Sequence, residues 1–312
     1  MAAVDVVAPQ GSIFSEEKFI KDIVATSEEI GAPYNVDSLK QVMSLYGEYF
    51  KEGVCMWRTT DRPGDIINYR FVLHRRVDTL QRAIDAGMVP QGAANPMIAL
   101  TKQFGDLFEG DTEEWCDFHP TKGLAKNWIF LRKLRPVDAV LNCPDVPEVI
   151  RAHGPTFHAL GLDEIRIAAV DYHHASMNLY FAAPGPITLD QATKYVNTML
   201  GEGQCDPPTA EEFEDMKSFL KPNGWSFTVT MDTKTGVIGR VGFYGLHNGG
   251  RKVKTFGPKL AKYLAEHPCY DSHRSSLIAW SYGLNNSKYQ KVESSYTGEF
   301  EGHLRNVKAP FS

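Results

Sequence analysis

The amino-acid sequence predicts an α+β protein: a closed ten-stranded antiparallel β-barrel made of five repeated α-β-β-α units, with helices outside and a ligand-filled lumen. Pairs of runs with alternating polarity recur five times, each pair around a short polar turn. Segments of helical periodicity separate the pairs. The turn centres are 58, 53, 60 and 52 residues apart, the near-constant spacing of a repeated supersecondary unit, and they lie at Pro63, Thr121, His174, Lys234 and Asn286.

Closure of the sheet follows from its width. Helices cover the apolar faces of all ten predicted strands from one side, and closing the sheet removes its unpaired edges. A ten-stranded barrel is too wide for its own side chains to fill, so the lumen has room for a ligand. No linker interrupts the chain, and we expect a flexible arm at 1–13, one barrel domain at 14–300 and a C-terminal tail at 301–312.

The elements follow in order along the chain. Ser15 is the expected N-cap of a first helix, and Gly87 suits the C-cap of a third. Helices are predicted at 15–30, 37–52, 77–87, 96–106, 136–142, 146–159, 186–201, 209–220 and 255–266. Strand pairs are predicted at 54–60 and 65–74, 113–119 and 124–132, 164–172 and 176–182, 225–232 and 237–245, and 277–285 and 288–296.

Composition limits the classes of function. The net charge of −5 argues against partners such as nucleic acid or an anionic membrane surface. The five cysteines are scattered and form no CxxC pair, which is typical of free thiols in a reducing compartment. No secretion signal and no apolar run of about 18 residues is visible. We therefore expect a cytoplasmic monomer whose partners are small molecules.

Alternation along each strand predicts which side chains enter the lumen. We expect the smoother apolar face to pack on helices; in the third pair, Ile165, Ile167 and Ala169 share the face opposite Arg166. The predicted lumen set is Arg58, Asn68, Arg70, Lys126, Trp128, Phe130, Arg166, Asn178, Tyr180, Arg240, Tyr244, Trp280, Tyr282, Tyr289, Lys291 and Glu293, with His174 at the rim.

This set contains six cations and a single acid, Glu293, inside an acidic protein. Unpaired buried cations are costly, so the lumen is predicted to receive a ligand with several negative charges, such as a diphosphate. The interleaved aromatic rings suit a flat or cationic organic group. Any one arginine on a strand is more often solvated or ion-paired, and only the agreement of five hairpins supports the set.

A metal site is not predicted. His173 and His174 are adjacent on the chain, so their side chains point to opposite faces, and only Asp171 is placed to join His173. The chain contains no DDxxD cluster, no GxGxxG and no P-loop.

The chain resembles the aromatic prenyltransferases of the ABBA barrel type, over about Phe19 to Gly298. It is most similar to the enzymes that prenylate 4-hydroxyphenylpyruvate in aminocoumarin pathways and to fungal relatives that act on dihydroxynaphthalenes. Six stretches in the correct order carry the resemblance: MWRTTDRPGDIINYRF, VDTLQRAIDAG, KGLAKNWIF, IRIAAVDYHHASMNLYF, TKTGVIGRVGFYG and IAWSYGL with YQKVESSYTG.

The resemblance implies a PT barrel that holds an allylic diphosphate, usually dimethylallyl, and an aromatic acceptor. It implies catalytic roles for Glu293 and Arg166. The diphosphate-binding residues would be Arg58, Arg70, Lys126, His174, Asn178, Arg240 and Lys291. The prenyl and aromatic pocket would be formed by Trp128, Tyr180, Tyr244, Trp280 and Tyr282.

Three positions differ from relatives. Magnesium-dependent relatives carry an Asp near position 68, where this chain has Asn68; His174 replaces a Lys, and Thr228 replaces an inward Tyr. We therefore expect no required cofactor, and magnesium not to be essential.

The predicted reaction is a Friedel–Crafts alkylation of a phenolic or hydroxynaphthalene ring by an alkyl transferase. A non-catalytic barrel that binds an anionic aromatic ligand, a phosphohydrolase, and the same transfer with geranyl diphosphate remain alternatives.

Overall fold

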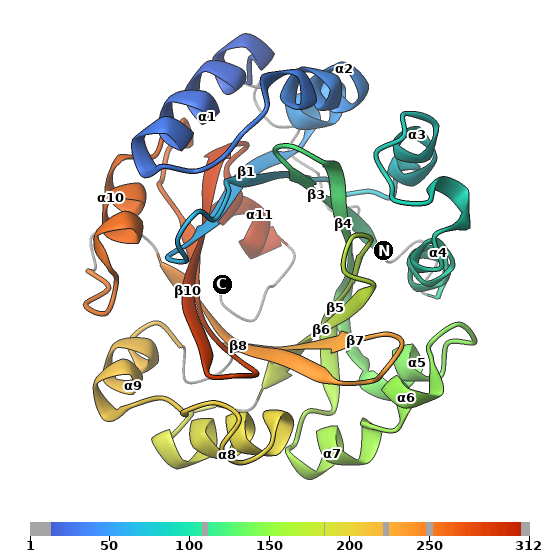
Figure 1. Cartoon of the computed structure of the whole chain (residues 1–312), viewed down its shortest axis with the longest axis vertical. Coiled ribbons are helices and arrows are strands. Elements are labelled where there is room, and N and C mark those ends of the chain that lie inside the picture. The colour runs from blue at the N-terminus through green and yellow to red at the C-terminus, as the bar shows by residue number, and fades with distance from the viewer. Residues whose placement is uncertain (1–13, 108–111, 184, 221–224, 248–251, 307–312) are drawn as a thin grey trace, which may run out of the picture.

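The structure contains the predicted closed barrel, with helices around its outside (Figure 1). Ten strands, each antiparallel to its neighbours, close in the order β1-β10-β9-β8-β7-β6-β5-β4-β3-β2. The predicted arm at 1–13 lies outside the described residues. The computed structural model describes residues 14–107, 112–183, 185–220, 225–247 and 252–306.

Each predicted strand pair forms a hairpin, and pairing of β1 with β10 closes the ring, with Arg58 opposite Glu293. The strands are β1 (Val54–Thr60), β2 (Asn68–Val72), β3 (Glu113–His119), β4 (Gly123–Pro136), β5 (Glu164–Asp171), β6 (Ser176–Ala183), β7 (Trp225–Asp232), β8 (Ile238–His247), β9 (Ser276–Gly283) and β10 (Ser287–Thr297).

Helices precede the first hairpin, separate successive hairpins and follow the last one along the chain. They are α1 (Glu16–Ile30), α2 (Val36–Glu52), α3 (Thr79–Asp85), α4 (Met97–Asp106), α5 (Val137–Leu141), α6 (Glu148–Arg151), α7 (Gly154–Ala159), α8 (Leu189–Leu200), α9 (Ala210–Lys217), α10 (Pro258–Glu266) and α11 (Phe300–Asn306), with the 3₁₀ turn η1 (Gly92–Ala94). The single helix predicted at 146–159 is wrong: two short helices replace it, because Pro155 follows Gly154 and starts a new helix.

Local sequence explains where the first helices begin and end. The Ser15 side chain accepts a hydrogen bond from the Lys18 amide at the start of α1, as predicted. Gly87 takes the left-handed conformation, φ 68°, directly after α3. The outward faces of the strands pack on the helices; Phe19 of α1 lies edge-on to Trp57 and Tyr69. This outer layer is a continuous aromatic and aliphatic core.

The last helix, α11, corrects the predicted tail. It lies within the outline of the barrel in Figure 1, and Phe300 and Leu304 are buried against the lumen residues rather than the outer core. Asp271 caps its N-terminus by accepting hydrogen bonds from the amides of Glu299 and Phe300. The structure thus gives the barrel a floor that alternation along strands does not predict.

One strand changes face partway along its length. A β-bulge between Ile165 and Ile167 shifts the register of β5 against β6. Ile165 packs in the outer core as predicted, whereas Ile167 and Ala169 face the lumen, and Ala168 faces outward. The prediction that Ile167 and Ala169 share the outer face with Ile165 is therefore wrong. The bulge brings Arg166 and Ile167 to the lumen together.

Candidate active site

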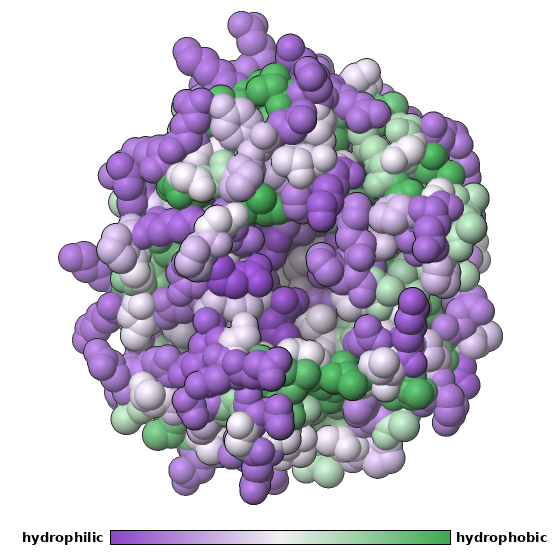
Figure 2. Space-filling view, in the orientation of Figure 1, coloured by the Kyte–Doolittle hydropathy of each residue, from purple (hydrophilic) through white to green (hydrophobic). Residues whose placement is uncertain are grey.

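The two ends of the lumen differ in chemistry. All five hairpin turns, at 61–67, 120–122, 172–175, 233–237 and 284–286, lie at one end, which we call the turn end. The helical connections enter at the other, the connection end, where α11 lies. Figure 2 shows a face of the molecule on which mostly hydrophilic residues surround a central hollow.

A layer of cationic side chains lies in the half of the lumen nearer the turn end. Arg58, Lys126, Arg240 and Lys291 come from four different strands, and the charges of Arg58 and Arg240 act on both lysines. Lys291 is 6 % exposed and Arg70, the fifth cation, 1 %. The structure thus brings together five of the six cations that the sequence analysis assigned to the lumen. We call these five residues the cationic layer.

Acidic residues partner the cationic layer, and sequence analysis missed most of them. Arg70 pairs with Asp117 and with Glu293, each at 3.0 Å, and Lys291 also pairs with Glu293 at 3.0 Å. Lys126 lies 3.6 Å from Asp171. The prediction of a single lumen acid is therefore wrong. Asp117 was identifiable, since it is the residue of β3 that faces Arg70 across the sheet.

Burial opposes the charges of both Glu293 and Lys291, but the neighbouring cations favour the charge of Glu293 and oppose that of Lys291. Burial opposes ionisation of Glu293, but the charges of Arg70, Lys291 and Arg58 outweigh it and lower the pKa to about 2. Burial also opposes the positive charge of Lys291. The charges of Arg58 and Arg240 repel its ammonium group, and Glu293 offsets only part of these effects. The pKa of Lys291 therefore falls to about 7. Glu293 is therefore a carboxylate at neutral pH, whereas Lys291 sits at the midpoint of its titration.

Polar residues at the turn end lie next to the cationic layer. Asp171 forms an ion pair with Lys126 and accepts hydrogen bonds from the His174 amide and ring. His174 is exposed at the turn, as predicted. The His173 ring instead contacts the Leu124 carbonyl, so the two histidines diverge. Asn178 is buried in the lumen, and its Oδ1 has no hydrogen-bond partner among the described residues.

Two further contacts fix the guanidinium groups. Arg240 donates to Thr230 Oγ1 at 3.1 Å. Arg58 donates to Asn68 when the amide of Asn68 is oriented with its oxygen toward the guanidinium, with the Nε–O distance at 3.3 Å. The neutral amide oxygen of Asn68 thus accepts a hydrogen bond from Arg58 and adds no negative charge to the lumen.

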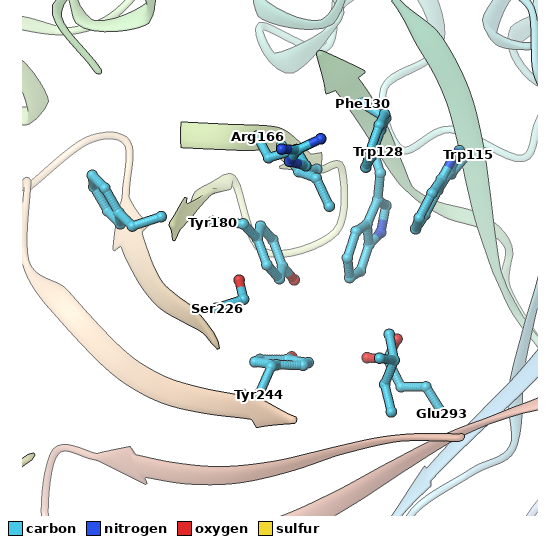
Figure 3. A pocket seen from close by; sticks show the side chains of 11 residues that line it. Trp115, Trp128, Phe130, Arg166, Tyr180, Ser226, Tyr244 and Glu293 are labelled. Atoms are coloured by element: carbon cyan, nitrogen blue, oxygen red, sulfur yellow. The ribbon is translucent and has the colours of Figure 1, made fainter. Parts of the chain in front are cut away.

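Next to the cationic layer lies an aromatic pocket of about 460 Å³. Trp115, Trp128 and Phe130 form one wall, and Tyr180 and Tyr244 lie across from them (Figure 3). The lining residues are Trp115, Trp128, Phe130, Arg166, Ile167, Tyr180, Phe181, Ser226, Tyr244, Leu277 and Glu293. The structure therefore places Trp128, Tyr180, Tyr244, Arg166 and Glu293 together, as the sequence analysis expected.

The pocket and the cationic layer share a boundary. The Arg70 guanidinium lies 4.4 Å from the Trp128 ring centre, and the Lys291 ammonium lies 4.3 Å from the Tyr244 ring centre and donates to its hydroxyl. The Glu293 carboxylate is directed into the same space in Figure 3. A ligand that spans this boundary meets cations at one end and π faces at the other.

Two predicted pocket residues are elsewhere. Trp280 and Tyr282 lie in the outer core, where Trp280 stacks near Phe219 and Tyr282 meets Phe243 edge-on. Their assignment to the lumen is wrong, because the smaller residues of β9, such as Leu277 and Ala279, face inward. Large rings at these positions gain more contact area against the helices than in the lumen.

Sequence reasoning also missed five lining residues: Trp115, Ile167, Phe181, Ser226 and Leu277. Trp115 of β3 stacks with Phe130 at 5.3 Å and was not assigned to a face. Ile167 differs from the prediction because of the bulge, and Ser226 of β7 is absent from the predicted lumen set. Alternation on β3 was the available signal for Trp115, because it lies two residues from Asp117.

A closed barrel of five such repeats, with cations and aromatic rings sharing its lumen, defines the class of prenyltransferase barrels. Two crystal structures of 5-dimethylallyltryptophan synthase from Streptomyces coelicolor have this fold. They match with TM-scores of 0.53 and 0.51, at 11% and 10% identity, and the alignments cover 91% of this chain and 97% and 95% of theirs.

The family follows from sequence comparison. The model of the family described as "Aromatic prenyltransferase Orf2" matches residues 14–307. An aromatic prenyltransferase of Arthroderma otae is 41% identical over 94% of both chains, and one of Sclerotinia sclerotiorum is 39% identical over 92% of this chain and 93% of its own. The 4-hydroxyphenylpyruvate 3-dimethylallyltransferase of Streptomyces niveus is 33% identical over 93% of this chain and 87% of its own.

The chain therefore belongs to the aromatic prenyltransferase family and is an enzyme of that class. Among the described residues, no helix is both long and apolar enough to cross a bilayer.

Proposed function

We propose that this enzyme transfers a dimethylallyl group from its diphosphate to an electron-rich phenolic or hydroxynaphthalene ring, without a metal ion. The observation that carries the proposal is the shared boundary of the cationic layer with an aromatic pocket. The name of the Streptomyces niveus relative supports dimethylallyl as the donor group. The wall of aromatic rings suits a flat acceptor ring stacked beside a short allylic chain.

The cationic layer would act on the leaving group. The donor's C1–O bond breaks, its electron pair goes to the diphosphate, and negative charge on those oxygens grows in the transition state. The contacts of Arg58, Lys126, Arg240 and Lys291 with Asn68, Asp171, Thr230 and Glu293 hold the four cations before the substrate arrives, so they would stabilise this charge with little reorganisation. Arg70 is held by two acids and would contribute mainly through its position beside the others.

The pocket would shelter the cation that remains. An allylic cation between the faces of Trp128, Tyr180 and Tyr244 is stabilised by cation–π contact and kept from water. The acceptor ring then attacks this carbon, and a new C–C bond forms. The ring finally loses the proton from the attacked carbon.

Glu293 and Arg166 would serve the acceptor. Glu293 is ionised and borders the pocket, so it would hold the acceptor hydroxyl or take the released proton, directly or through water. Arg166 lines the pocket, and its guanidinium donates to the Arg132 carbonyl at 3.2 Å. It is placed to bind an acceptor carboxylate or polarise its hydroxyl.

The number of cations in the lumen supports the proposal of metal-independent turnover. In a metal-dependent transfer, a divalent ion neutralises the diphosphate. Here five cationic side chains face one lumen, and position 68 carries an amide that supports Arg58 instead of a carboxylate that would hold an ion. Asp117, Asp171 and Glu293 offset three of these five charges, and the remaining two equal the charge of one divalent ion.

The test is product formation from defined substrates. Purified enzyme is incubated with dimethylallyl diphosphate and 4-hydroxyphenylpyruvate or a dihydroxynaphthalene, with and without EDTA, and analysed by mass spectrometry. We expect an adduct of one prenyl unit at an unchanged rate in EDTA. No adduct with any acceptor would favour a binding barrel, and an adduct only with geranyl diphosphate would assign the longer donor. Loss of turnover in EDTA that magnesium restores would contradict metal independence.

Donor binding is expected to take up a proton. The pKa of Lys291 is about 7 in the free enzyme, and an adjacent diphosphate favours the ammonium form, so the pKa rises on binding. At pH 8 the uptake approaches one proton per site, and at pH 6 it falls toward zero because the lysine is already charged. Donor affinity therefore weakens as the pH rises above 7.

Calorimetry of dimethylallyl diphosphate binding without acceptor, in two buffers of different ionisation enthalpy, measures this uptake. The Lys291→Met variant should bind more weakly and show no uptake. Equal heats in both buffers at pH 8 for the wild type would show that Lys291 does not change protonation.

A further inference from the structure

We infer a second, previously unassigned site: a transition-metal site at the connection end, formed by His74, Glu113 and His303. These residues come from three distant segments. His74 follows β2, Glu113 begins β3, and His303 lies on α11. One ligand atom from each lies within 4.8 Å of the other two. The inference does not depend on the proposed transfer reaction.

The distances are close to those of a bound ion. The Nε2 atom of His303 lies 3.7 Å from Oε2 of Glu113, and Nδ1 of His74 lies 3.7 Å from Oε1 of Glu113. Ligand atoms around a tetrahedral zinc ion with bonds of about 2.0–2.2 Å are about 3.3–3.6 Å apart. The two distances use different oxygens of Glu113, and the three ligand atoms lie within 4.8 Å of one another, so the half-exposed His74 side chain would move toward the other two ligands when an ion binds.

The buried atoms of the cluster are unsatisfied. Nε2 of His303 and Oε2 of Glu113 are both buried and have no hydrogen-bond partner among the described residues. Leaving two buried polar atoms unpaired is costly, and a metal ion between them would satisfy both. The 3.0 Å contact between His74 Nε2 and His303 Nδ1 shows that the two rings already meet.

Neighbouring side chains orient the ligands as an outer shell would. The Trp115 ring lies edge-on to the His303 ring at 5.7 Å. The Arg132 guanidinium lies 3.3 Å from Oε1 of Glu113 and also donates to the His74 carbonyl. Arg132 therefore holds one carboxylate oxygen and leaves the other directed at His303, which is how outer-shell partners orient a ligating carboxylate.

The donor set selects the class of ion. Two imidazoles and one carboxylate suit zinc and other divalent first-row transition metals, whereas magnesium and calcium prefer oxygen ligands. This site is separate from the cationic layer, which lies toward the turn end. Because α11 supplies His303 and also the buried Phe300 and Leu304, the ion would clamp the floor of the aromatic pocket to β2 and β3.

The test measures metal binding directly, on the full-length enzyme after chelator treatment. We expect one equivalent of Zn²⁺ to bind in calorimetry, Co²⁺ to give a visible absorption spectrum of imidazole ligation, and Zn²⁺ at a hundredfold excess over its dissociation constant to raise the melting temperature by about 5 °C. Mg²⁺ should do none of these.

Variants separate this site from chance binding. His74→Ala removes a half-exposed side chain and should weaken Zn²⁺ binding by at least about tenfold, the loss that removal of even an outer-shell partner causes. His303→Ala should do the same but also removes a buried ring from α11. The control is His273→Ala, an exposed histidine outside the cluster. Absence of binding to the wild type, or equal binding by wild type and His74→Ala, would overturn the inference.

Discussion

Replacing Lys126 with methionine should lower turnover by about 10²–10³, the cost of removing one preorganised donor to a developing negative charge. Methionine keeps the length and the apolar stem of the side chain and removes only the ammonium group. Lys126 lies in the lumen opposite Asp171 and within the field of Arg58 and Arg240, so no mobile surface cation can take its place. The measurement is steady-state prenylation with saturating donor and acceptor.

Lys288 provides the matched control. It lies on β10 close to the turn end, but its ammonium group pairs with Glu212 at 2.8 Å and lies over the Tyr282 ring on the outer face. Lys288→Met should leave turnover within about twofold, because it is remote from the leaving group. If Lys126→Met retains wild-type turnover while folding normally, the diphosphate does not bind where we place it.

The repeat spacing and strand alternation were enough to predict the barrel and most of its cationic layer. Hairpin turns recur at a fixed period, and a cation on an otherwise apolar strand marks the inward face, as for Arg70 and Lys126. These signals are local, because each depends on a few residues of one hairpin. Lumen-facing residues in such regular strands were therefore predictable.

Structural features that depend on packing between distant segments were not predictable from the sequence. The bulge at Ile165 and Ile167 breaks the two-residue period and reverses the faces beyond it. Trp280 lies in the outer core, 5.9 Å from the tilted ring of Phe219, which follows α9. The floor formed by α11 has a weak signal, since Phe300 and Leu304 alone mark its buried side.

Charge pairing across the lumen was missed for a different reason. Alternation along one strand carries no information on strand register, and register sets Asp117 opposite Arg70 and Asp171 opposite Lys126. The consequence is physical: the lumen is less positive than six unpaired cations would make it. Its charges are held in fixed positions by acids, which favours preorganisation over a high net charge.

Arg70 is the residue whose loss should cost the most stability. It joins Asp117 and Glu293, whose side chains are 5 % and 1 % exposed, and removing it leaves two buried carboxylates without their shared cation. Breaking a buried ion pair from one side typically costs about 3–5 kcal/mol in free energy of unfolding. We expect Arg70→Met to lose this amount in urea denaturation at pH 7.

The pH dependence of the free energy of unfolding gives a second test of the ion pair between Arg70 and Glu293. The pKa of Glu293 is about 2 in the folded enzyme, well below the ordinary glutamate value of 4.5. Its ionisation therefore stabilises the fold above about pH 4.5, and this contribution disappears as the pH falls toward 2. Arg70→Met raises the folded pKa of Glu293, so the variant should be relatively less impaired in acid than at pH 7.

Arg75→Met is the control, because Arg75 forms a shorter ion pair, 2.7 Å from Glu52, but with both side chains about half exposed. Solvent screens that pair, so its loss should cost less than about 1 kcal/mol. The double variant Arg70→Met with Glu293→Gln removes one of the stranded charges and should recover part of the loss. If Arg70→Met costs no more than Arg75→Met, the acids do not depend on Arg70, and the cationic layer is not held in place by the pairs described.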